Sequence, residues 1–197
     1  LLKDFCAYVD DEFPSSNHII AANEGAAIGL AIGHHLSSGK IPLVYLQNSG
    51  LGNTVNPLIS LASQEVYSIP IILVIGWRGE PGIKDEPQHI HQGRITPNFL
   101  EVMDIPYKII DSSMDQLEIL NTIENQIRNC KRYKKPVCIL VRKGTFETYE
   151  KKINKFLNSK FELEREEAVQ IATKVCEPNS VIVCTTGMLS RELFEFR

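Results

Sequence analysis

The run Ala22-Asn23-Glu24-Gly25-Ala26-Ala27 places one carboxylate between a short apolar stretch and a helix rich in small residues. The apolar stretch, residues 17–21, predicts a buried parallel strand. In open α/β sheets ligands bind outside the carboxyl ends of the strands, so an acid at this junction would face a crevice. An acid in the first helical turn is also stabilised by the helix dipole without any further role. Position alone leaves both interpretations of Glu24 open.

The helix after Glu24 carries Gly25, Gly29 and Gly33 at intervals of four residues, which places them on one face. Each glycine costs about 1 kcal/mol relative to alanine inside a helix. Close approach of another backbone, from a strand or a partner helix, would offset this cost. We therefore expect a packing or interface face there.

A second polar segment, Gln47-Asn48-Ser49-Gly50-Leu51-Gly52-Asn53, follows an apolar run and precedes a helix. Two glycines at a helix start can cradle an anion, and we expect this segment to converge on the same crevice edge as Glu24. A plain strand-to-helix turn with Asn53 as a cap is the alternative. As a dinucleotide fingerprint the segment lacks the third glycine and the acidic residue further on. A nicotinamide-dependent oxidoreductase is therefore disfavoured.

The segment 76–94 is dense in glycine, proline and charge, and we expect a long loop that acts as a mobile cover. Arg78 and Arg94 within it have the planar guanidinium that suits an anionic substrate group. His89 and His91 suggest a metal pair, but no third ligand has an obvious spacing. No metal site is therefore predicted in this segment.

Near-continuous apolar runs alternate with helical patterns along the chain, which predicts a doubly wound α/β domain with a mostly parallel sheet. The expected strands are 42–46, 70–75, 107–110 and 136–141, and the expected helices are 1–9, 51–64, 96–103 and 114–130. Residues 143–160 turn polar and predict a linker. After it we expect a helix over 165–176, a strand over 180–185 and a helix from 187. The predicted organisation is thus one domain, 1–142, and the opening of a second, 161–197.

Composition sets limits on the function. With 43% hydrophobic residues and a net charge of −3, the 197-residue chain predicts a soluble protein with one sizeable core. Its one short basic run, 131–135, is expected to end a helix, so nucleic acid is not an expected partner. Five cysteines without a CxxC pair predict neither zinc nor a disulfide framework and favour a reducing cytoplasm. No apolar run is long enough to span a bilayer.

Four motifs in their order and spacing resemble the pyrimidine-binding domain of thiamine diphosphate enzymes, which include acetolactate synthases and 2-oxo acid decarboxylases. They are Ala22–Ala27, Ser38–Lys40, Asn48–Asn53 and Ser68–Pro70. Within this family, Gln47–Pro57 and Gly76–Gly82 are most similar to the decarboxylases of 3-phosphonopyruvate, with those of sulfopyruvate as close relatives.

The resemblance implies a role for each candidate residue. Glu24 would hydrogen-bond the N1′ atom of the cofactor's aminopyrimidine and so promote loss of the thiazolium C2 proton. The remaining assignments are cofactor contacts for Asn48, Ser49, Gly50 and Asn53, and substrate contacts for Gln47, Arg78 and Arg94. The implied reaction converts the small anionic 2-oxo acid 3-phosphonopyruvate to phosphonoacetaldehyde and carbon dioxide.

Two departures from the family pattern are present. The family's Gly-Asp-Gly motif for diphosphate and Mg²⁺ does not occur, and no aspartate follows Asp115. Residues 188–194 resemble the start of the diphosphate-binding domain, and the family's first strand would precede Leu1. We therefore expect a piece of a longer homo-oligomeric enzyme that is inactive alone. A non-catalytic pyrimidine-domain subunit that needs a partner is the alternative.

Overall fold

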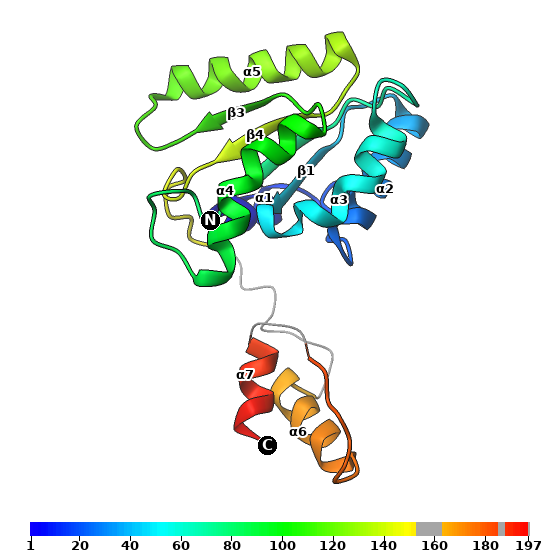
Figure 1. The fold of residues 1–197 in the computed structure, drawn as a ribbon, viewed down its shortest axis with the longest axis vertical. Coiled ribbons are helices and arrows are strands. Elements are labelled where there is room, and N and C mark those ends of the chain that lie inside the picture. Colours follow the sequence, from blue (N-terminus) through cyan, green and yellow to red (C-terminus); the bar gives the residue numbers. More distant parts are fainter. Residues whose placement is uncertain (153–162, 185–187, 197) are drawn as a thin grey trace. The chain divides into compact units, whose positions relative to one another are not determined.

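The computed structural model describes residues 1–152, 163–184 and 188–196 (Figure 1). The chain divides into two compact units, Leu1–Lys152 and Ile153–Arg197. The first unit contains every candidate site residue named above, and the two units are described separately.

Four parallel strands form the sheet of the first unit, in the order β1-β2-β4-β3. The strands are β1 (Leu43–Gln47), β2 (Ile72–Gly76), β3 (Tyr107–Ile110) and β4 (Val137–Val141). In the register of the ladder Leu43 lies opposite Ile72, and Ile72 lies opposite Val137. All residues of β2 and β4 are buried, because helices cover both faces of the sheet. The predicted α/β class and all four of these strands are confirmed.

The helices are distributed over the two faces of the sheet. One hydrophobic cluster joins the sheet to α2, α3, η2 and α4, and a second cluster joins the other face to α1 and α5. The bounds are α1 (Lys3–Glu12), α2 (Glu24–Ser38), η1 (Asn48–Gly50), α3 (Leu51–Pro57), η2 (Leu58–Ala62), α4 (Pro87–Val102) and α5 (Gln116–Tyr133). Alternate residues of β2 supply the two clusters, with Leu73 and Ile75 in the first and Ile72 and Val74 in the second.

The predicted strand at 17–21 is wrong. These residues have no strand conformation, and Ile19 and Ile20 are 65% and 84% exposed. His18 of this segment contacts Tyr45 of β1, but the segment forms no ladder with this edge strand of the described sheet. Residues 17–21 are thus apolar, as a buried strand would be, but they are neither buried nor paired with a strand.

Prolines account for two further differences from the predicted helices. The helix expected over 51–64 ends as an α-helix at Pro57 and continues as the π-helical turn η2 to Ala62, since Pro57 has no N–H for the α-helical ladder. The helix expected over 96–103 begins at Pro87 instead, which occupies the helix start where a missing N–H costs nothing. Residues 87–94 are thus helical, and the prediction of a loop through 94 is wrong.

The helix expected over 114–130 is α5, which begins with a capping box formed by Asp115 and Glu118. Lys131 and Arg132 occupy its last turn, as the basic run predicted. Beyond β4, residues 143–152 belong to the first unit and are tied to α1: the backbone N–H of Tyr149 donates to Asp4, 3.0 Å away.

The second unit contains α6 (Arg165–Val175) and α7 (Met188–Glu195). Residues 180–184 of the expected strand are not in a strand, and Val181 and Val183 are 87% and 90% exposed. No strand lies beside them among the residues described in this unit, so the apolar run again lacks a ladder partner. Thr185 and the linker residues 153–160 lie outside the described residues.

Candidate active site

The segment that leads to Glu24 is fastened to β1 by a histidine. The Nε2 atom of His18 lies 2.5 Å from the hydroxyl of Tyr45, and the two rings stack at 5.9 Å. Burial, and then the neighbouring Cys6, raise the pKa of Tyr45 to about 12. The phenol therefore stays protonated at neutral pH.

Glu24 is the first residue of α2, and the residue before it caps this helix. Asn23 is extended, and its side chain accepts a hydrogen bond from the N–H of Ala26 at 2.8 Å. The cap fixes where the helix starts, and hence where the Glu24 side chain leaves the backbone.

The carboxylate of Glu24 lies against the segment after β1. Nδ2 of Asn53 donates to Glu24 Oε2 over 2.8 Å. A Cβ atom placed on Gly50 would be only 2.3 Å from Cδ and Oε1 of Glu24, so the carboxylate occupies the space that a side chain at position 50 would fill. The predicted convergence of Glu24 with the segment 47–53 is thus present in the fold.

The predicted packing role of the glycines in α2 applies at one of the three positions. A Cβ on Gly25 would lie 2.8 Å from the carbonyl oxygen of Asn53, so the backbones of α2 and α3 approach closely there. That carbonyl has no α-helical donor in α3, because the residue four positions on is Pro57. At Gly29 and Gly33 no atom from outside the helix backbone lies within 4 Å of the Cβ position, so among the described residues no other backbone packs against them.

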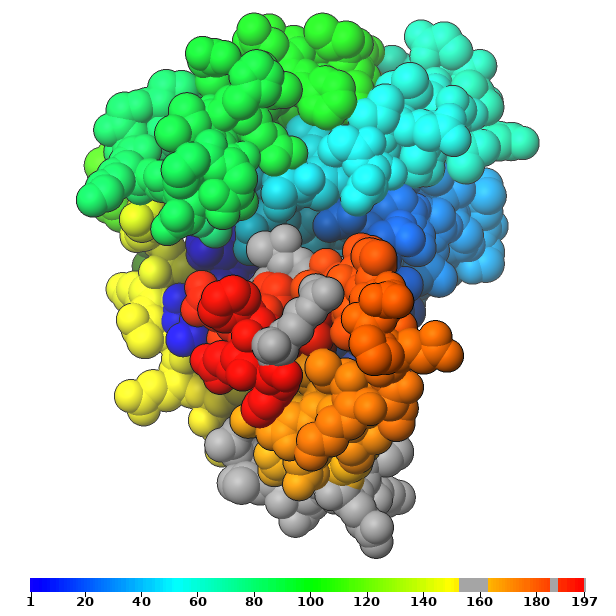
Figure 2. Space-filling view, turned by 60° about the horizontal axis from the view of Figure 1, so that its bottom comes forward, coloured from blue at the N-terminus to red at the C-terminus, as the bar shows by residue number. Residues whose placement is uncertain are grey.

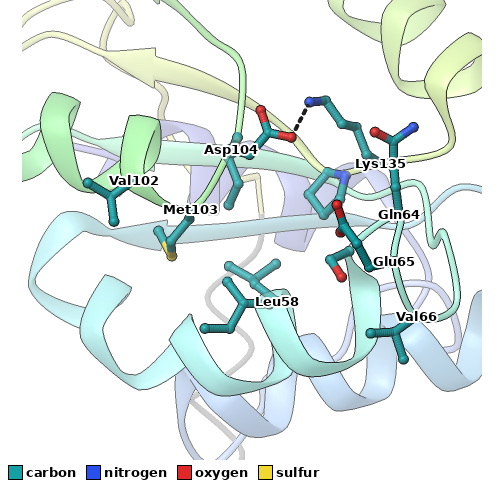
Figure 3. Close-up of a pocket in the computed structure, with 12 residues that line it drawn as sticks. Leu58, Gln64, Glu65, Val66, Val102, Met103, Asp104 and Lys135 are labelled. Atoms are coloured by element: carbon teal, nitrogen blue, oxygen red, sulfur yellow. Dashed lines mark hydrogen bonds and ion pairs between the residues drawn. The ribbon is translucent and has the colours of Figure 1, made fainter.

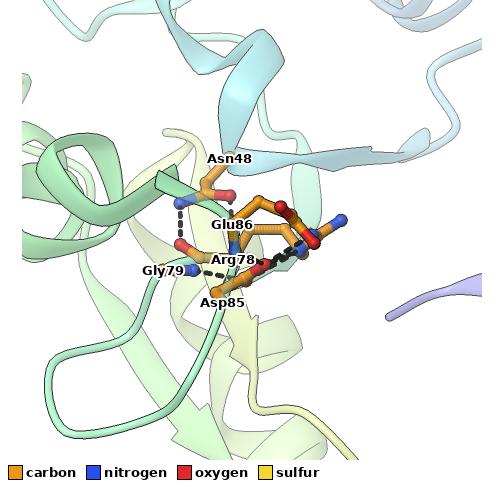
Figure 4. A network of polar contacts seen from close by, with 5 residues as sticks. All are labelled: Asn48, Arg78, Gly79, Asp85 and Glu86. Carbon is orange, nitrogen blue, oxygen red and sulfur yellow. Dashed lines mark hydrogen bonds and ion pairs between the residues drawn. The ribbon is translucent and has the colours of Figure 1, made fainter. Parts of the chain in front are cut away.

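Asn48 joins the end of β1 to the neighbouring loop and helix. Its Nδ2 donates to the carbonyl of Arg78 at 2.8 Å, and its Oδ1 accepts from the N–H of Arg78 at 3.0 Å (Figure 4). The same Nδ2 also donates to the hydroxyl of Thr96 at 2.9 Å. Gln92 donates to the Asn48 carbonyl at 2.8 Å. Asn48 is 1% exposed, so both ends of its amide are used inside the protein.

Arg78 forms a bidentate ion pair with Asp85, which closes the loop between β2 and α4 (Figure 4). Nε of Arg78 lies 2.8 Å from Asp85 Oδ2, and Nη2 lies 2.5 Å from Oδ1. The N–H groups of Gly79 and Glu86 also donate to this carboxylate, each at 2.8 Å. The Arg78 guanidinium and these N–H groups hold the pKa of Asp85 well below its usual range.

A tryptophan and two glycines pack this loop on α4. Pro97 leaves the carbonyl of Gly93 without its helical donor, and the indole N–H of Trp77 donates to that carbonyl at 2.8 Å. Gly79 has a positive φ of 68°, and a Cβ there would lie 1.8 Å from the carbonyl oxygen of His89. The first part of the expected cover is therefore packed directly on the helix.

The remaining candidate residues are on the surface. Gln47 at the end of β1 and Ser49 in η1 are exposed. Arg94 is exposed on α4, where its Nη2 lies 2.9 Å from Nδ1 of His91. Within the described ranges, no three His, Cys, Asp or Glu side chains gather as metal ligands would.

A groove of about 410 Å³ lies at the opposite edge of the sheet, where β3 and β4 begin (Figure 3). Its walls come from η2, the end of α4 and the turn before β4, and Lys135 bridges to Asp104 over 2.8 Å at its rim. In Figure 2 the cyan atoms of α3 and the green atoms of α4 lie beside each other on this unit. The groove contains none of the candidate residues, and ligands of open α/β sheets bind at the other edge. We therefore place the candidate active site at Glu24 and not in the groove.

Comparison with known proteins identifies the family. The family described as "Thiamine pyrophosphate enzyme, N-terminal TPP binding domain" matches residues 2–101, which is half of the chain. The chain belongs to this family. In this domain the Glu24 carboxylate lies at the carboxyl edge of the sheet, bonded to Asn53 and packed beside the backbone of Gly50.

The relatives that the chain matches are named as decarboxylases. The chain is 40% identical over 104 residues to phosphonopyruvate decarboxylase of Streptomyces viridochromogenes, covering 53% of this chain and 25% of that protein. It is 35% identical over 113 residues to sulfopyruvate decarboxylase subunit alpha of Methanothermobacter thermautotrophicus, covering 57% and 66%. To sulfopyruvate decarboxylase of Methanosarcina acetivorans it is 30% identical over 151 residues, covering 76% and 36%. The chain thus spans about a quarter of the first of these relatives.

Three residues of this thiamine pyrophosphate enzyme domain that shape the site were not among the predicted site residues. Asp85 pairs with Arg78, and Gln92 and Thr96 bind Asn48. Pro87 was the sequence signal that could have revealed two of them. A helix that begins at this proline places Gln92 and Thr96 one turn apart on the same face of α4. The pairing of Arg78 with Asp85 carries no periodicity that the sequence alone would reveal.

Proposed function

We propose that the protein from which this chain comes is a thiamine diphosphate-dependent decarboxylase of 3-phosphonopyruvate, with Glu24 as its cofactor-activating carboxylate. The observation that carries the proposal is the Glu24 carboxylate, 2.8 Å from Asn53 and fitted against Gly50, in a chain that belongs to the thiamine pyrophosphate enzymes. When bound, thiamine diphosphate supplies the electron sink for the electrons released as carbon dioxide leaves.

The residues of this chain have separate tasks in the proposed site. Glu24 binds and polarises the pyrimidine ring by a charge-assisted hydrogen bond. Ser49 and Gly50 border the same edge, and Gln47 and Arg94 offer exposed polar groups to an anionic substrate. Arg78 and Asn48 are proposed to shape the rim of the active site, because their polar groups are bonded within the protein. Mg²⁺ and the diphosphate would be held by residues outside this chain's described part.

A second candidate is a sulfopyruvate decarboxylase, in which this chain acts as one subunit with a partner. The relative from Methanothermobacter thermautotrophicus, 35% identical to this chain, is named as an alpha subunit and favours this alternative. Phosphonate and sulfonate are both tetrahedral oxyanions, so the same cations suit either substrate. The ratio of kcat/KM for the two substrates decides between them. For the first candidate we propose a homo-oligomer, with the cofactor between subunits.

The test of the proposed function is Glu24→Gln in the full-length enzyme. Glutamine keeps the size of the side chain but removes the charge, so kcat is expected to fall about 100-fold or more, in the range of general acid–base contributions. Carbon dioxide release under saturating cofactor measures this effect. Glu65→Gln, a change of the same kind at an exposed residue of the groove, is the control and should retain activity. Full activity of Glu24→Gln would exclude the assigned role.

A further inference from the structure

Asn53 contacts α2 through both its side chain and its backbone. Its Nδ2 donates to Glu24 Oε2 at 2.8 Å, and its carbonyl oxygen would lie 2.8 Å from a Cβ on Gly25. The two contacts reach consecutive residues of α2 from one residue of α3, so Asn53 fixes the carboxylate relative to the helix that carries it.

The geometry of this contact depends on two residues that cannot be exchanged freely. Pro57 has no N–H, so it leaves the Asn53 carbonyl free to face α2. Gly50 leaves room for the other side of the Glu24 carboxyl group, where a Cβ would lie 2.3 Å from Oε1. The carboxylate is thus held by an amide on one side and limited by backbone on the other.

We propose that Asn53 is a positioning residue: its amide orients the Glu24 carboxylate and does not itself bind the cofactor. This inference rests on the proposed function, since it deepens the role of Glu24. A neutral donor suits the task, because it fixes the direction of the carboxylate without cancelling the charge that the pyrimidine ring requires. An arginine or lysine at position 53 would orient the group equally well but would weaken that charge.

The first test compares Asn53→Asp with Asn56→Asp in the full-length enzyme. Both are the same change on α3, but Asn56 is exposed and its side chain accepts a hydrogen bond from Ser60. Asn53→Asp removes the donor and places a second carboxylate beside Glu24. We expect kcat to fall about 10- to 100-fold, the effect of a misplaced catalytic group, while KM for the 2-oxo acid changes less than roughly threefold.

The pH profile separates positioning from a merely structural role. Two adjacent carboxylates resist simultaneous ionisation, so the acidic limb of kcat should move to higher pH in Asn53→Asp. The variant Asn53→Ala should lower kcat without this movement. Asn56→Asp should leave both kcat and the profile as in the wild type. An unchanged profile in Asn53→Asp, or equal losses in the two aspartate variants, would overturn the inference.

A second measurement is independent of catalysis and of the cofactor. In the 197-residue chain, the side-chain amide resonance of Asn53 should shift on Glu24→Gln, whereas that of Asn56 should not. If Asn53 shifts but Glu24→Gln is fully active in the complete enzyme, the contact stands and the proposed function fails. If Glu24→Gln is inactive but Asn53→Asp has normal kcat, the proposed function stands and the positioning role is refuted.

Discussion

At the residue scale, the candidate site depends on one glycine that makes room for one carboxylate. Gly50 has φ −89° and ψ −7°, a conformation that any residue adopts, so its small size and not its backbone freedom is what the site uses. The group it accommodates, the end of the Glu24 side chain, is flexible and would move before the backbone does. A side chain at position 50 is therefore expected to change the position of the Glu24 carboxylate more than the stability of the fold.

Substitution of this glycine should separate activity from stability. We expect Gly50→Ala to displace the Glu24 carboxylate and to lower kcat of the full-length enzyme about 10- to 100-fold, because displacement of about 1 Å is costly to catalysis. Thermal unfolding should shift by only a few degrees. Gly52→Ala is the matched control, since no atom lies within 4 Å of its Cβ position, and it should have wild-type activity. Wild-type kcat in Gly50→Ala would show that the carboxylate need not occupy this space.

At the scale of elements, the loop between β2 and α4 is closed on itself. Asp85 binds Arg78 in a bidentate pair and accepts the N–H groups of Gly79 and Glu86, and the indole of Trp77 ties the loop to α4. The interpretation of this segment as a mobile cover overlooked contacts between residues that lack any regular spacing. Arg78 is bonded to Asp85 inside this loop, and its contact with a substrate stays a prediction.

This clamp predicts an acid-dependent loss of stability. Because Arg78 lowers the pKa of Asp85, the pair stabilises the fold above the ordinary aspartate pKa of about 3.9, and this contribution is lost as the pH falls below that value. Asp85→Asn should therefore lower Tm by several degrees at pH 6, and the gap to the wild type should narrow progressively as the pH falls from about 4 toward the depressed pKa of Asp85. Thermal unfolding, monitored by circular dichroism, measures the Tm of both proteins at each pH.

The control for this prediction is a second ion pair in the same unit. Asp104→Asn removes the pair with Lys135, in which the aspartate side chain is 81% exposed. Exposed pairs contribute about 0–1 kcal/mol, so Tm should change little at either pH. A gap for Asp85→Asn that persists unchanged at low pH would contradict the proposed cause.

At the scale of the whole molecule, the first unit carries the Glu24 half of the candidate site. The Gly-Asp-Gly motif expected for diphosphate and Mg²⁺ is absent from the sequence, and no cluster of metal ligands occurs within 1–152, 163–184 and 188–196. Among these residues, no helix is both long and apolar enough to cross a membrane. Among the described residues, these observations identify no site for the Mg²⁺ of the proposed reaction.

The 197-residue chain, folded and supplied with thiamine diphosphate and Mg²⁺, is therefore expected to release no carbon dioxide from 3-phosphonopyruvate. The physical reason is that Glu24 is proposed to bind the pyrimidine end of the cofactor, whereas no anchor for its diphosphate end is identified among the described residues. A coupled assay for carbon dioxide measures this, with the full-length enzyme under the same conditions as the positive control. Turnover by the chain alone would mean that it contains a diphosphate site of its own.

The sequence alone determined the class of fold and the position of Glu24. Apolar runs long enough for one strand predicted β1 to β4, because strands buried on both faces need no polar alternation. Helical periodicity also predicted the helix that begins at Glu24 and a helix over 114–130, which are α2 and α5, whereas their caps were seen only in the structure.

Tertiary structure decided which of these signals became structure and which side chains meet. The apolar runs 17–21 and 180–184 had the composition of strands but form no ladder with a described strand, and composition does not specify a ladder partner. The contact of Asn53 with Glu24 depends on how α3 packs on α2, and that of Arg78 with Asp85 on the fold of the loop after β2; no periodicity encodes either contact. Glu24 and Asn53 were therefore both candidates from the sequence, whereas the hydrogen bond between them was visible only in the fold.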